Sequence, residues 1–312
     1  MALRSFTSSS KLIKYVSILL LSLVTIFGLD HILFENLFPQ YDKMYEVKKN
    51  FVPAEVLVIG SSHALWDIDP TVLQTKTGKP TTMVSIPGAN LELRRQILEE
   101  YVRKYPTLKY LVLETDKYAF DELRYSKDAY LQLLGYYHKN LFQTMLKEKR
   151  GNNFDFKVML VFKTHSLNSY SHFILSKLYD KYLPKFVKVL AKEPVPKPAN
   201  GDERVAEWRK EYNGNVPQMD SGLVSELHNT LTFAKEKGIQ VILLETPTYY
   251  FSESENAPFD VIRSKIKTMG NEAGAKFIRF PEFEKTSELF FDASHLLPSS
   301  RQSFTERLAK EI

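Results

Sequence analysis

A pair of serines follows directly after an apolar segment near the start of the chain. Residues 56–60 (VLVIG) have the composition of a strand buried on both faces, and Ser61 and Ser62 come next. A sharp turn after a strand exposes a hydroxyl at the sheet edge and directs backbone N–H groups toward one point. Such a hydroxyl becomes a nucleophile when a base takes its proton and donors stabilise the oxyanion. The pattern therefore predicts nucleophilic serine chemistry.

The base that such a serine needs is found close to the C-terminus. In the segment FFDASHLLPSSRQ, Asp292 and His295 are three residues apart. This spacing lets the carboxylate hold one imidazole nitrogen while the other faces the serine, as in a catalytic triad. We predict Ser62 as the nucleophile, His295 as its base and Asp292 as the residue that orients the base. Ser61 is the less favoured nucleophile, and it is also a candidate for the substrate pocket.

Other interpretations of these polar residues exist. Gly-Ser-Ser is common in loops, and Asp-x-x-His also arises when a helix-capping Asp precedes a surface His. His63 is interpreted as a hydrogen-bonding or rim residue of the pocket, because neighbouring side chains on an extended backbone diverge. A metal cluster of His63, Asp67 and Asp69 fits no standard spacing, so no metal site is predicted. Glu114 and Asp116 resemble the paired carboxylates of glycosidases, with nothing else to support that chemistry.

Alternating strands and helices have to position these residues. Short apolar segments predict strands at residues 55–59, 82–86, 109–114, 240–245 and 276–280. Amphipathic segments predict helices at residues 90–105, 221–238 and 257–274, and from about 298 to the C-terminus. The repeated β-α-β order predicts an α/β fold, a three-layer α/β/α arrangement around a roughly five-stranded parallel sheet. In such folds the site lies at the carboxyl ends of the strands. Arg94 is expected on the polar face of its helix.

A stretch from about residue 117 to residue 218 interrupts this alternation within a domain predicted at 54–312. We interpret it as a helical insertion over the strand ends, with aromatic residues forming its own core. The alternatives are a substrate cap, or a basic face near lipid headgroups formed by Lys185, Lys188 and Lys192. After the fourth strand, Tyr249 and Tyr250 are candidate walls of the substrate pocket, although ordinary packing explains them equally well.

The N-terminus carries a candidate membrane segment. Leu12 to Leu29 spans 18 residues, roughly 27 Å as a helix, which crosses a bilayer if Lys14 reaches outward. No small-x-small cleavage site follows, so a retained signal anchor over residues 1–35 is favoured over a cleaved signal peptide. Basic residues before the span predict a cytoplasmic N-terminus, with a connector at 36–53 and an extracytoplasmic domain.

Composition narrows the classes of function. The chain has no cysteine, which excludes thiol catalysis, disulfides and cysteine-based zinc sites. A net charge of +5 over 312 residues is compatible with an anionic membrane surface or polymer and too weak to indicate nucleic acid. No glycine-rich phosphate loop is present, and no cofactor is predicted.

Three sequence blocks together resemble a known superfamily. GSS after the first strand, SIPGAN after the second and DASH before the last helix are similar to the motifs of the SGNH/GDSL hydrolases. The resemblance implies a flavodoxin-like α/β/α fold with Ser62 as nucleophile, Gly88 as an oxyanion donor, and His295 and Asp292 completing the triad. The anchor, Gly-Ser-Ser in place of Gly-Asp-Ser, and Asp69-Pro70 resemble the DltD-like envelope proteins, which act with membrane-bound O-acyltransferases.

The third block of the superfamily departs from the pattern. Gly-x-Asn-Asp should follow the third strand, and here the sequence is LETDKYAF, with Asp116 at roughly the place of the asparagine. An ionised carboxylate there would repel an oxyanion. Asn90, or the backbone amides of Ser62 and Gly88 alone, are the candidate substitutes. Loss of one such donor typically lowers the rate roughly 100- to 1000-fold.

These observations leave three functional hypotheses. The first is a membrane-anchored serine acyl-esterase or O-acyltransferase that acts on an envelope glycan or acylated cell-wall polymer through an acyl-serine. The second is a non-catalytic scaffold with this fold that partners a membrane-bound O-acyltransferase, as the missing asparagine suggests. The third is a lipid esterase held near its substrate by the anchor. Transfer and hydrolysis use the same catalytic residues, so the sequence leaves both open.

Overall fold

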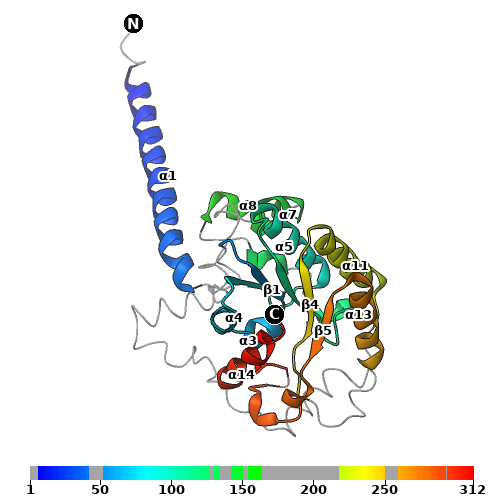
Figure 1. Cartoon of the computed structure of the whole chain (residues 1–312). Coiled ribbons are helices and arrows are strands. Elements are labelled where there is room, and N and C mark those ends of the chain that lie inside the picture. Colours follow the sequence, from blue (N-terminus) through cyan, green and yellow to red (C-terminus); the bar gives the residue numbers. More distant parts are fainter. Residues whose placement is uncertain are drawn as a thin grey trace. The chain divides into compact units, whose positions relative to one another are not determined.

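The computed structural model of the chain describes residues 6–41, 52–126, 129–133, 142–149, 154–163, 218–249, 259–292 and 294–312 (Figure 1). The chain divides into two compact units. One unit comprises Met1–Asp42 with Leu131–Lys185, and we call it the anchor unit. The other comprises Lys43–Tyr130 with Phe186–Ile312 and contains the whole sheet, so we call it the sheet unit.

The sheet has five strands, all paired in parallel, in the order β2-β1-β3-β4-β5. The strands are β1 (Val56–Gly60), β2 (Thr81–Ser85), β3 (Tyr110–Glu114), β4 (Gln240–Glu245) and β5 (Lys276–Arg279). Val58 in β1 is paired with Met83 on one side and Val112 on the other, and all three side chains are buried. The predicted parallel five-stranded sheet is confirmed, and every strand boundary lies within one residue of its prediction.

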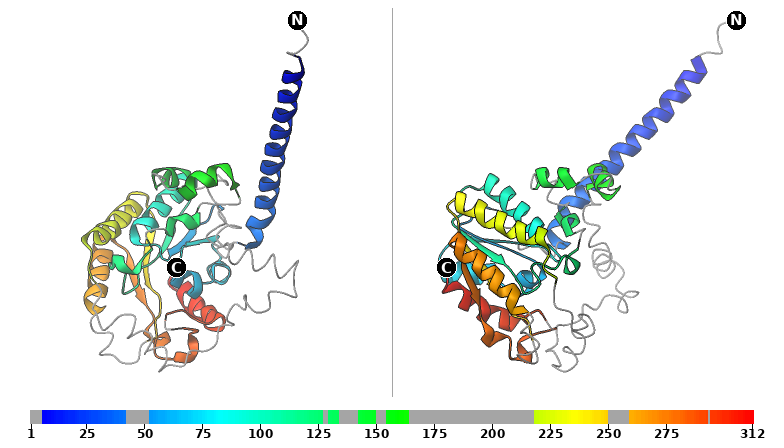
Figure 2. Two further views of the ribbon diagram at one scale, coloured as in Figure 1. Left: turned by 180° about the vertical axis from the view of Figure 1, so that it is seen from behind. Right: turned by 90° about the vertical axis from the view of Figure 1, so that its right-hand side faces the viewer.

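The helices of the sheet unit contact one another in two groups (Figure 2). The first group is α5 (Leu91–Lys104), α11 (Ser221–Glu236) and α13 (Asp260–Ala273), and the second is α3 (Ser62–Asp67), α4 (Pro70–Thr77) and α14 (Pro298–Ala309). Side chains alternate along a strand, so Val56 and Val58 point away from Leu57 and Ile59. Val56 and Val58 belong to one apolar cluster with Phe304 and Leu308 of α14. This packing fixes the C-terminal helix close to the start of the chain's first strand.

Arg94 corrects the sequence-based assignment of the polar face of α5. Its side chain is fully buried, although the residue type predicted exposure. Position 94 itself lies on the buried face of α5. Leu91, Leu98 and Tyr101 lie three, four and seven residues from it, on the same side of the helix, and are buried as well. A buried guanidinium needs hydrogen-bonding partners, and those partners form part of the site described below.

The short 3₁₀ turns and two further helices complete the described elements. They are η1 (Glu122–Arg124), η2 (Ala129–Leu133), α7 (Gln143–Lys149), α8 (Phe154–Val161), η5 (Pro281–Phe283) and η6 (Ser287–Leu289). Most of the predicted insertion lies outside the described residues, including Lys185, Lys188 and Lys192, and so does Tyr250. Its described parts include α7 and α8, which belong to the anchor unit.

The N-terminal helix α1 (Phe6–Tyr41) contains a segment long and apolar enough to cross a membrane. That segment runs from Leu12 to Asn36 and has a mean hydropathy of 2.2. Its large apolar side chains up to Leu33 are exposed, whereas Asp30 and Phe34 are buried. It extends beyond the predicted span of Leu12–Leu29, because the helix continues through Asp30 and His31 into another apolar run. An apolar helix of this length near an N-terminus is compatible with a spanning anchor and with a signal sequence.

Candidate active site at the carboxyl ends of the strands

Three neighbouring strands deliver polar residues to one edge of the sheet. Ser61 and Ser62 follow β1, the loop containing Gly88 follows β2, and Asp116 follows β3. Since β1 lies between β2 and β3 and all run in parallel, their carboxyl ends emerge side by side. The turn from β1 into α3 is tight: Ser61 is the N-cap, and its side chain accepts a hydrogen bond from the His63 N–H.

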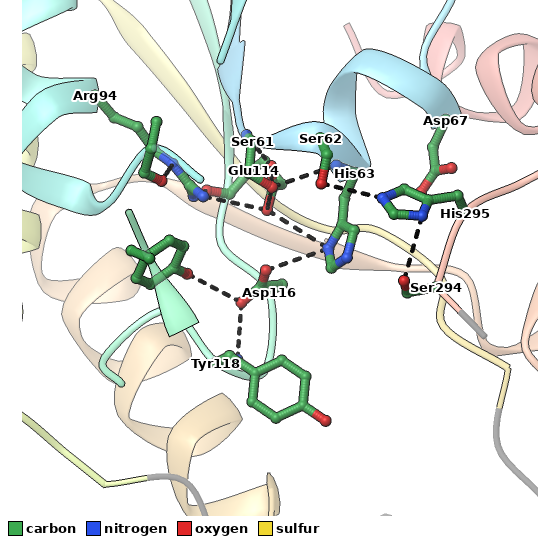
Figure 3. Close-up of polar contacts among 12 residues, drawn as sticks. Ser61, Ser62, His63, Asp67, Arg94, Glu114, Asp116, Tyr118, Ser294 and His295 are labelled. Atoms are coloured by element: carbon green, nitrogen blue, oxygen red, sulfur yellow. Dashed lines mark hydrogen bonds and ion pairs between the residues drawn. The ribbon is translucent and has the colours of Figure 1, made fainter. Parts of the chain in front are cut away.

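Ser62, His295 and Asp292 form one chain of hydrogen bonds. The Oγ of Ser62 lies 3.0 Å from Nε2 of His295 (Figure 3). On the other side of the ring, Nδ1 of His295 lies 2.8 Å from Oδ2 of Asp292. Because the Asp292 carboxylate accepts a hydrogen bond from Nδ1 of His295, Nδ1 carries the proton of the neutral imidazole. Nε2 then has a lone pair that can accept the serine proton. The structure thus brings together two residues 233 positions apart, as the sequence analysis expected.

The loop that carries His295 is held by several contacts. The other carboxylate oxygen of Asp292 accepts the backbone N–H groups of Ser294 and His295, each at 2.8 Å. The ring of Phe291 stacks on the His295 ring, with 5.4 Å between centroids. These contacts fix the position of the imidazole before any substrate binds, which is the pre-organisation that proton transfer requires.

Asp67 is a site residue whose role the sequence did not indicate. It lies at the end of α3, the helix that begins with Ser62, and its Oδ1 accepts the N–H of Leu296 at 2.8 Å. One buried carboxylate therefore ties the serine helix to the histidine loop. Burial raises the pKa of Asp67 well above its ordinary value, against the lowering effect of His63 and the Leu296 N–H. A protonated Asp67 still accepts that N–H, so the link does not need the charge.

The protonation states of the triad suit general base catalysis. Burial lowers the pKa of His295, and the positive charge of His63 acts in the same direction, while Asp292 opposes both. The imidazole is therefore neutral at neutral pH and able to accept a proton. Burial alone would raise the pKa of Asp292, but the hydrogen bond from His295 and that residue's charge lower it overall. Asp292 is accordingly an anion, which favours a positive charge on His295 when that imidazole accepts a proton.

Ser61 and Glu114 belong to a buried polar network beneath the site. The Ser61 hydroxyl lies 2.9 Å from Oε2 of Glu114, which also accepts the Ser61 N–H at 2.5 Å. Glu114 has no exposed surface, and Nη2 of Arg94 lies 3.5 Å from its Oε1. Arg94 also donates to the backbone carbonyls of Ala89 and Glu114, at 3.0 and 2.6 Å. The hydroxyl of Ser61 is thus engaged by a carboxylate and does not face His295, and Glu114 is too enclosed to act on a glycosidic bond.

Gly60 makes room for this network. A Cβ at position 60 would lie 2.5 Å from Oε2 of Glu114 and 2.4 Å from the Cβ of Ala64. No residue other than glycine allows both neighbours to approach so closely. The glycine before the two serines is therefore required for the carboxylate that holds Ser61.

His63 and Asp116 form an ion pair at the side of the cleft. Nδ1 of His63 lies 3.2 Å from Oδ2 of Asp116 (Figure 3). Burial opposes the charged imidazole, but Asp116, through its hydrogen bond and its charge, together with the charges of Glu114 and Asp67, raises the pKa of His63 to about 9. His63 is therefore protonated at neutral pH.

Asp116 is fixed as an anion by the same neighbours. Burial would raise its pKa, but the hydrogen bond and charge of His63, the charge of Arg94 and the Tyr118 N–H lower it overall. The Tyr118 N–H donates to Oδ1 at 2.8 Å, and the Tyr125 hydroxyl lies 3.4 Å from the same oxygen. The sequence predicted that Asp116 would repel an oxyanion. Beside a protonated His63, the pair carries no net charge, and that repulsion is largely cancelled.

The same three side chains have the donor atoms of a metal site. Nitrogen or oxygen atoms of His63, Glu114 and Asp116 lie within 4.8 Å of one another. However, Glu114 already accepts from Ser61 and faces the guanidinium of Arg94, a cation that disfavours a second one beside it. The sequence analysis also considered a metal cluster of His63, Asp67 and Asp69. In the structure Asp69 is the N-cap of α4, and Asp67 accepts the N–H of Leu296. We therefore interpret the contact between His63 and Asp116 as an ion pair and not as part of a metal site.

A small cleft of about 200 Å³ opens in front of Ser62. Its walls are formed by Ser61, Ser62, His63, Gly88, Asp116, Tyr118, Arg124, Tyr125 and Ser294. Gly88 has a φ of +75°, and a Cβ there would lie 3.0 Å from the Cβ of Ser126. Within the described residues, the amides of Ser62 and Gly88 donate to no backbone acceptor. Both residues line the cleft.

Asn90 and Tyr249 are placed away from this cleft. The Oδ1 of Asn90 accepts the Leu93 N–H at 2.9 Å and caps α5, and Asn90 is not among the lining residues. Tyr249 packs on Phe290, with 6.1 Å between ring centroids, and contacts the apolar cluster that includes α14. The described geometry gives Asn90 a capping role and Tyr249 a packing role.

Comparison with models of known protein families finds no match, and comparison with curated protein sequences finds none either.

Proposed function

We propose that this protein is a serine acyl-esterase or O-acyltransferase of the SGNH type. The observation that carries the proposal is the continuous hydrogen-bond chain from Ser62 through His295 to Asp292. A serine, a histidine and an aspartate that merely lie near the surface would not be expected to align in this order. The strand order 2-1-3-4-5 and the two helix groups also support a three-layer, flavodoxin-like arrangement of the kind that this superfamily uses.

The mechanism follows from the positions of the proton donors and acceptors. The Oγ of Ser62 attacks the acyl carbonyl while Nε2 of His295 takes its proton, and the tetrahedral intermediate carries the negative charge on the former carbonyl oxygen. His295 then returns the proton to the departing alcohol, which leaves an ester on Ser62. Water or a sugar hydroxyl next loses its proton to His295 and attacks that ester. Collapse of the second intermediate restores the Ser62 hydroxyl and releases an acid or a new ester.

His63 takes the place of the missing asparagine in this mechanism. The superfamily resemblance assigns the oxyanion to the Ser62 and Gly88 amides, and His63 lines the same cleft. A protonated imidazole donates a hydrogen bond and carries positive charge, so it stabilises an oxyanion at least as well as a neutral amide. Asp116 keeps that proton in place when the substrate is absent.

The cleft favours a small acyl group. A volume of about 200 Å³ holds an acyl group of a few carbon atoms, and the described walls include three serines, His63 and Asp116. Such polar walls favour acetyl transfer or removal on an oxygen-rich acceptor such as a glycan. The apolar helix α1, taken as a retained anchor with its N-terminus in the cytoplasm, would hold this chemistry at the cell envelope. By its resemblance to the DltD-like envelope proteins, the proposed partner is a membrane-bound O-acyltransferase.

A fluorophosphonate probe tests the proposal on the full chain in detergent. We expect the probe to label the wild type, with the adduct on the peptide containing Ser62, and Ser62→Ala to abolish labelling. Ser294→Ala is the matched control, because it removes another cleft hydroxyl, 3.4 Å from Nδ1 of His295, without breaking the triad. Equal labelling of wild type and Ser62→Ala would exclude Ser62 as the nucleophile.

Hydrolysis rates separate the proposal from the scaffold hypothesis. An acyl-esterase should cleave p-nitrophenyl acetate faster than the decanoate, and His295→Ala should lower the rate by about 10³-fold or more. A non-catalytic scaffold predicts no labelling, no ester cleavage and unimpaired complementation by His295→Ala in cells. Cleavage of the decanoate in preference to the acetate would instead favour the lipid esterase. Addition of a glycan acceptor distinguishes transfer from hydrolysis, since transfer yields an acylated sugar.

A further inference from the structure

The end of helix α8 packs on the part of α1 that follows the middle of the candidate span. The rings of Phe27 and Phe162 stack with 5.6 Å between centroids and 22° between planes. One residue later, the Lys163 N–H donates to Oδ2 of Asp30 at 2.7 Å, and Nζ of Lys163 lies 2.8 Å from Nδ1 of His31. Both segments belong to the anchor unit. The contact therefore joins a polar pair and an aromatic pair at adjacent positions.

These contacts set the depth of α8 if α1 crosses a bilayer. Phe27 is 15 residues beyond Leu12, and a helix rises about 1.5 Å per residue, so Phe27 lies roughly 22 Å from the inner boundary. The hydrocarbon core of a bilayer is about 30 Å thick. Phe27, and Phe162 with it, would then lie in the outer leaflet, while Asp30 and His31 come close to the outer boundary. The last turn of α8 would be at the level of lipid.

The surface at the end of α8 and just beyond it is apolar at that level. Leu160, Val161 and Phe162 are 41%, 52% and 37% exposed, which is unusual for three consecutive large apolar residues in water. Lys157 is also exposed, and it shares a helix face with Leu160 and Val161 by its spacing. Its aliphatic stem and charged end suit the boundary between hydrocarbon and headgroups. The surface thus matches an interfacial helix.

Asp30 fits the same arrangement. It is an acidic residue within a long apolar segment, and it is only 8% exposed. A carboxylate or an amide N–H without a partner is costly near hydrocarbon, and the Asp30–Lys163 contact satisfies both. We propose that residues 157–163 lie in the outer leaflet beside α1, so that the protein contacts the bilayer through an interfacial helix as well as a spanning one. This proposal rests on a retained anchor and is independent of the serine chemistry.

Single-cysteine labelling tests the proposal, because the natural chain has no cysteine. Val161→Cys, carrying the fluorophore NBD, is compared with Val261→Cys, an exposed valine of α13, in the full chain reconstituted into phosphatidylcholine and phosphatidylglycerol vesicles. Leu20→Cys, within α1, is the reference for full immersion. Lipids with a doxyl group on carbon 5 should quench NBD at position 161 at least twofold more than at position 261.

The outcomes are distinguishable. Quenching at position 161 no greater than at position 261, with strong quenching at position 20, would overturn the interfacial placement and leave the anchor intact. Absence of quenching at position 20 would overturn both the placement and the anchor, whereas fluorophosphonate labelling of Ser62 reports on the chemistry separately. Asp30→Leu removes the acceptor of the Lys163 N–H and should reduce quenching at position 161, and Asp30→Asn, which retains an acceptor oxygen, should preserve it.

Discussion

His63→Gln replaces a protonated imidazole, held by Asp116, with a neutral amide. The pKa of His63 rises from its ordinary value of 6.5 to about 9 on folding. Burial alone would lower this pKa, but the carboxylates of Asp116, Glu114 and Asp67 raise it by more. One pKa unit corresponds to about 1.4 kcal/mol, so the proton on His63 stabilises the folded protein by about 3 kcal/mol. The side chain is 13% exposed, so solvent screens this interaction only weakly.

The sign of the pH dependence follows from the raised pKa. A group that binds its proton more tightly in the folded state stabilises that state fully below pH 6.5, and the stabilisation is lost as the pH rises from 6.5 through 9. The quantity to compare is the free energy of unfolding of the wild type minus that of His63→Gln. We expect this difference to be about 3 kcal/mol larger at pH 6 than at pH 9.5. Other groups titrate in this range, including Lys117, whose pKa burial lowers to about 8. Comparison with the variant cancels their contributions.

Urea unfolding of the full chain in mild detergent provides the measurement. Trp66 is a suitable fluorescent reporter because its ring packs edge-on against Phe291 near the site, with 5.1 Å between centroids. A Trp208→Phe background removes the second tryptophan of the chain. His228→Gln, at an exposed position of α11, is the control substitution. A difference between wild type and His63→Gln that is the same at both pH values would refute the ion pair, and with it the proposed oxyanion role.

Three further substitutions probe the support of the site. Arg94→Met should lower the free energy of unfolding by about 3–5 kcal/mol, because it leaves the Glu114 carboxylate buried without the guanidinium that faces it. Arg103→Met, at an exposed position of the same helix, should lower it by less than about 0.5 kcal/mol. Similar losses for the two variants would contradict a buried Arg94–Glu114 pair. Gly88→Ala should cost about 1–3 kcal/mol in urea unfolding and slow ester cleavage, because a φ of +75° strains any residue with a Cβ; an unchanged stability would argue against this backbone conformation. Asp67→Asn should be tolerated at pH 5 and become stabilising relative to wild type toward pH 8, because burial raises the pKa of Asp67 and its ionisation disfavours the folded state; destabilisation that grows with pH would show that the charge is needed.

The sequence alone was sufficient to predict the strands of the sheet and the three residues of the hydrogen-bond chain that begins at Ser62. Strands buried on both faces appear as short apolar runs, so each strand end was predicted within one residue. Ser62, Asp292 and His295 were found because a nucleophile at a strand end and an Asp-x-x-His segment each have a local signature. Their meeting was then expected from the parallel topology, which gathers the carboxyl ends of the strands at one edge.

Tertiary structure alone decided the charge environment around the serine. Arg94 has the sequence character of a surface residue, and only packing against β3 shows that it is buried on Glu114. The proton on His63 depends on Asp116, 53 residues away, and the position of the histidine loop depends on Asp67 at the far end of α3. Local sequence patterns record which residues prefer water or a given backbone conformation. Burial and ion pairing between distant residues arise from the three-dimensional arrangement, because the energy of a charge is set by what surrounds it.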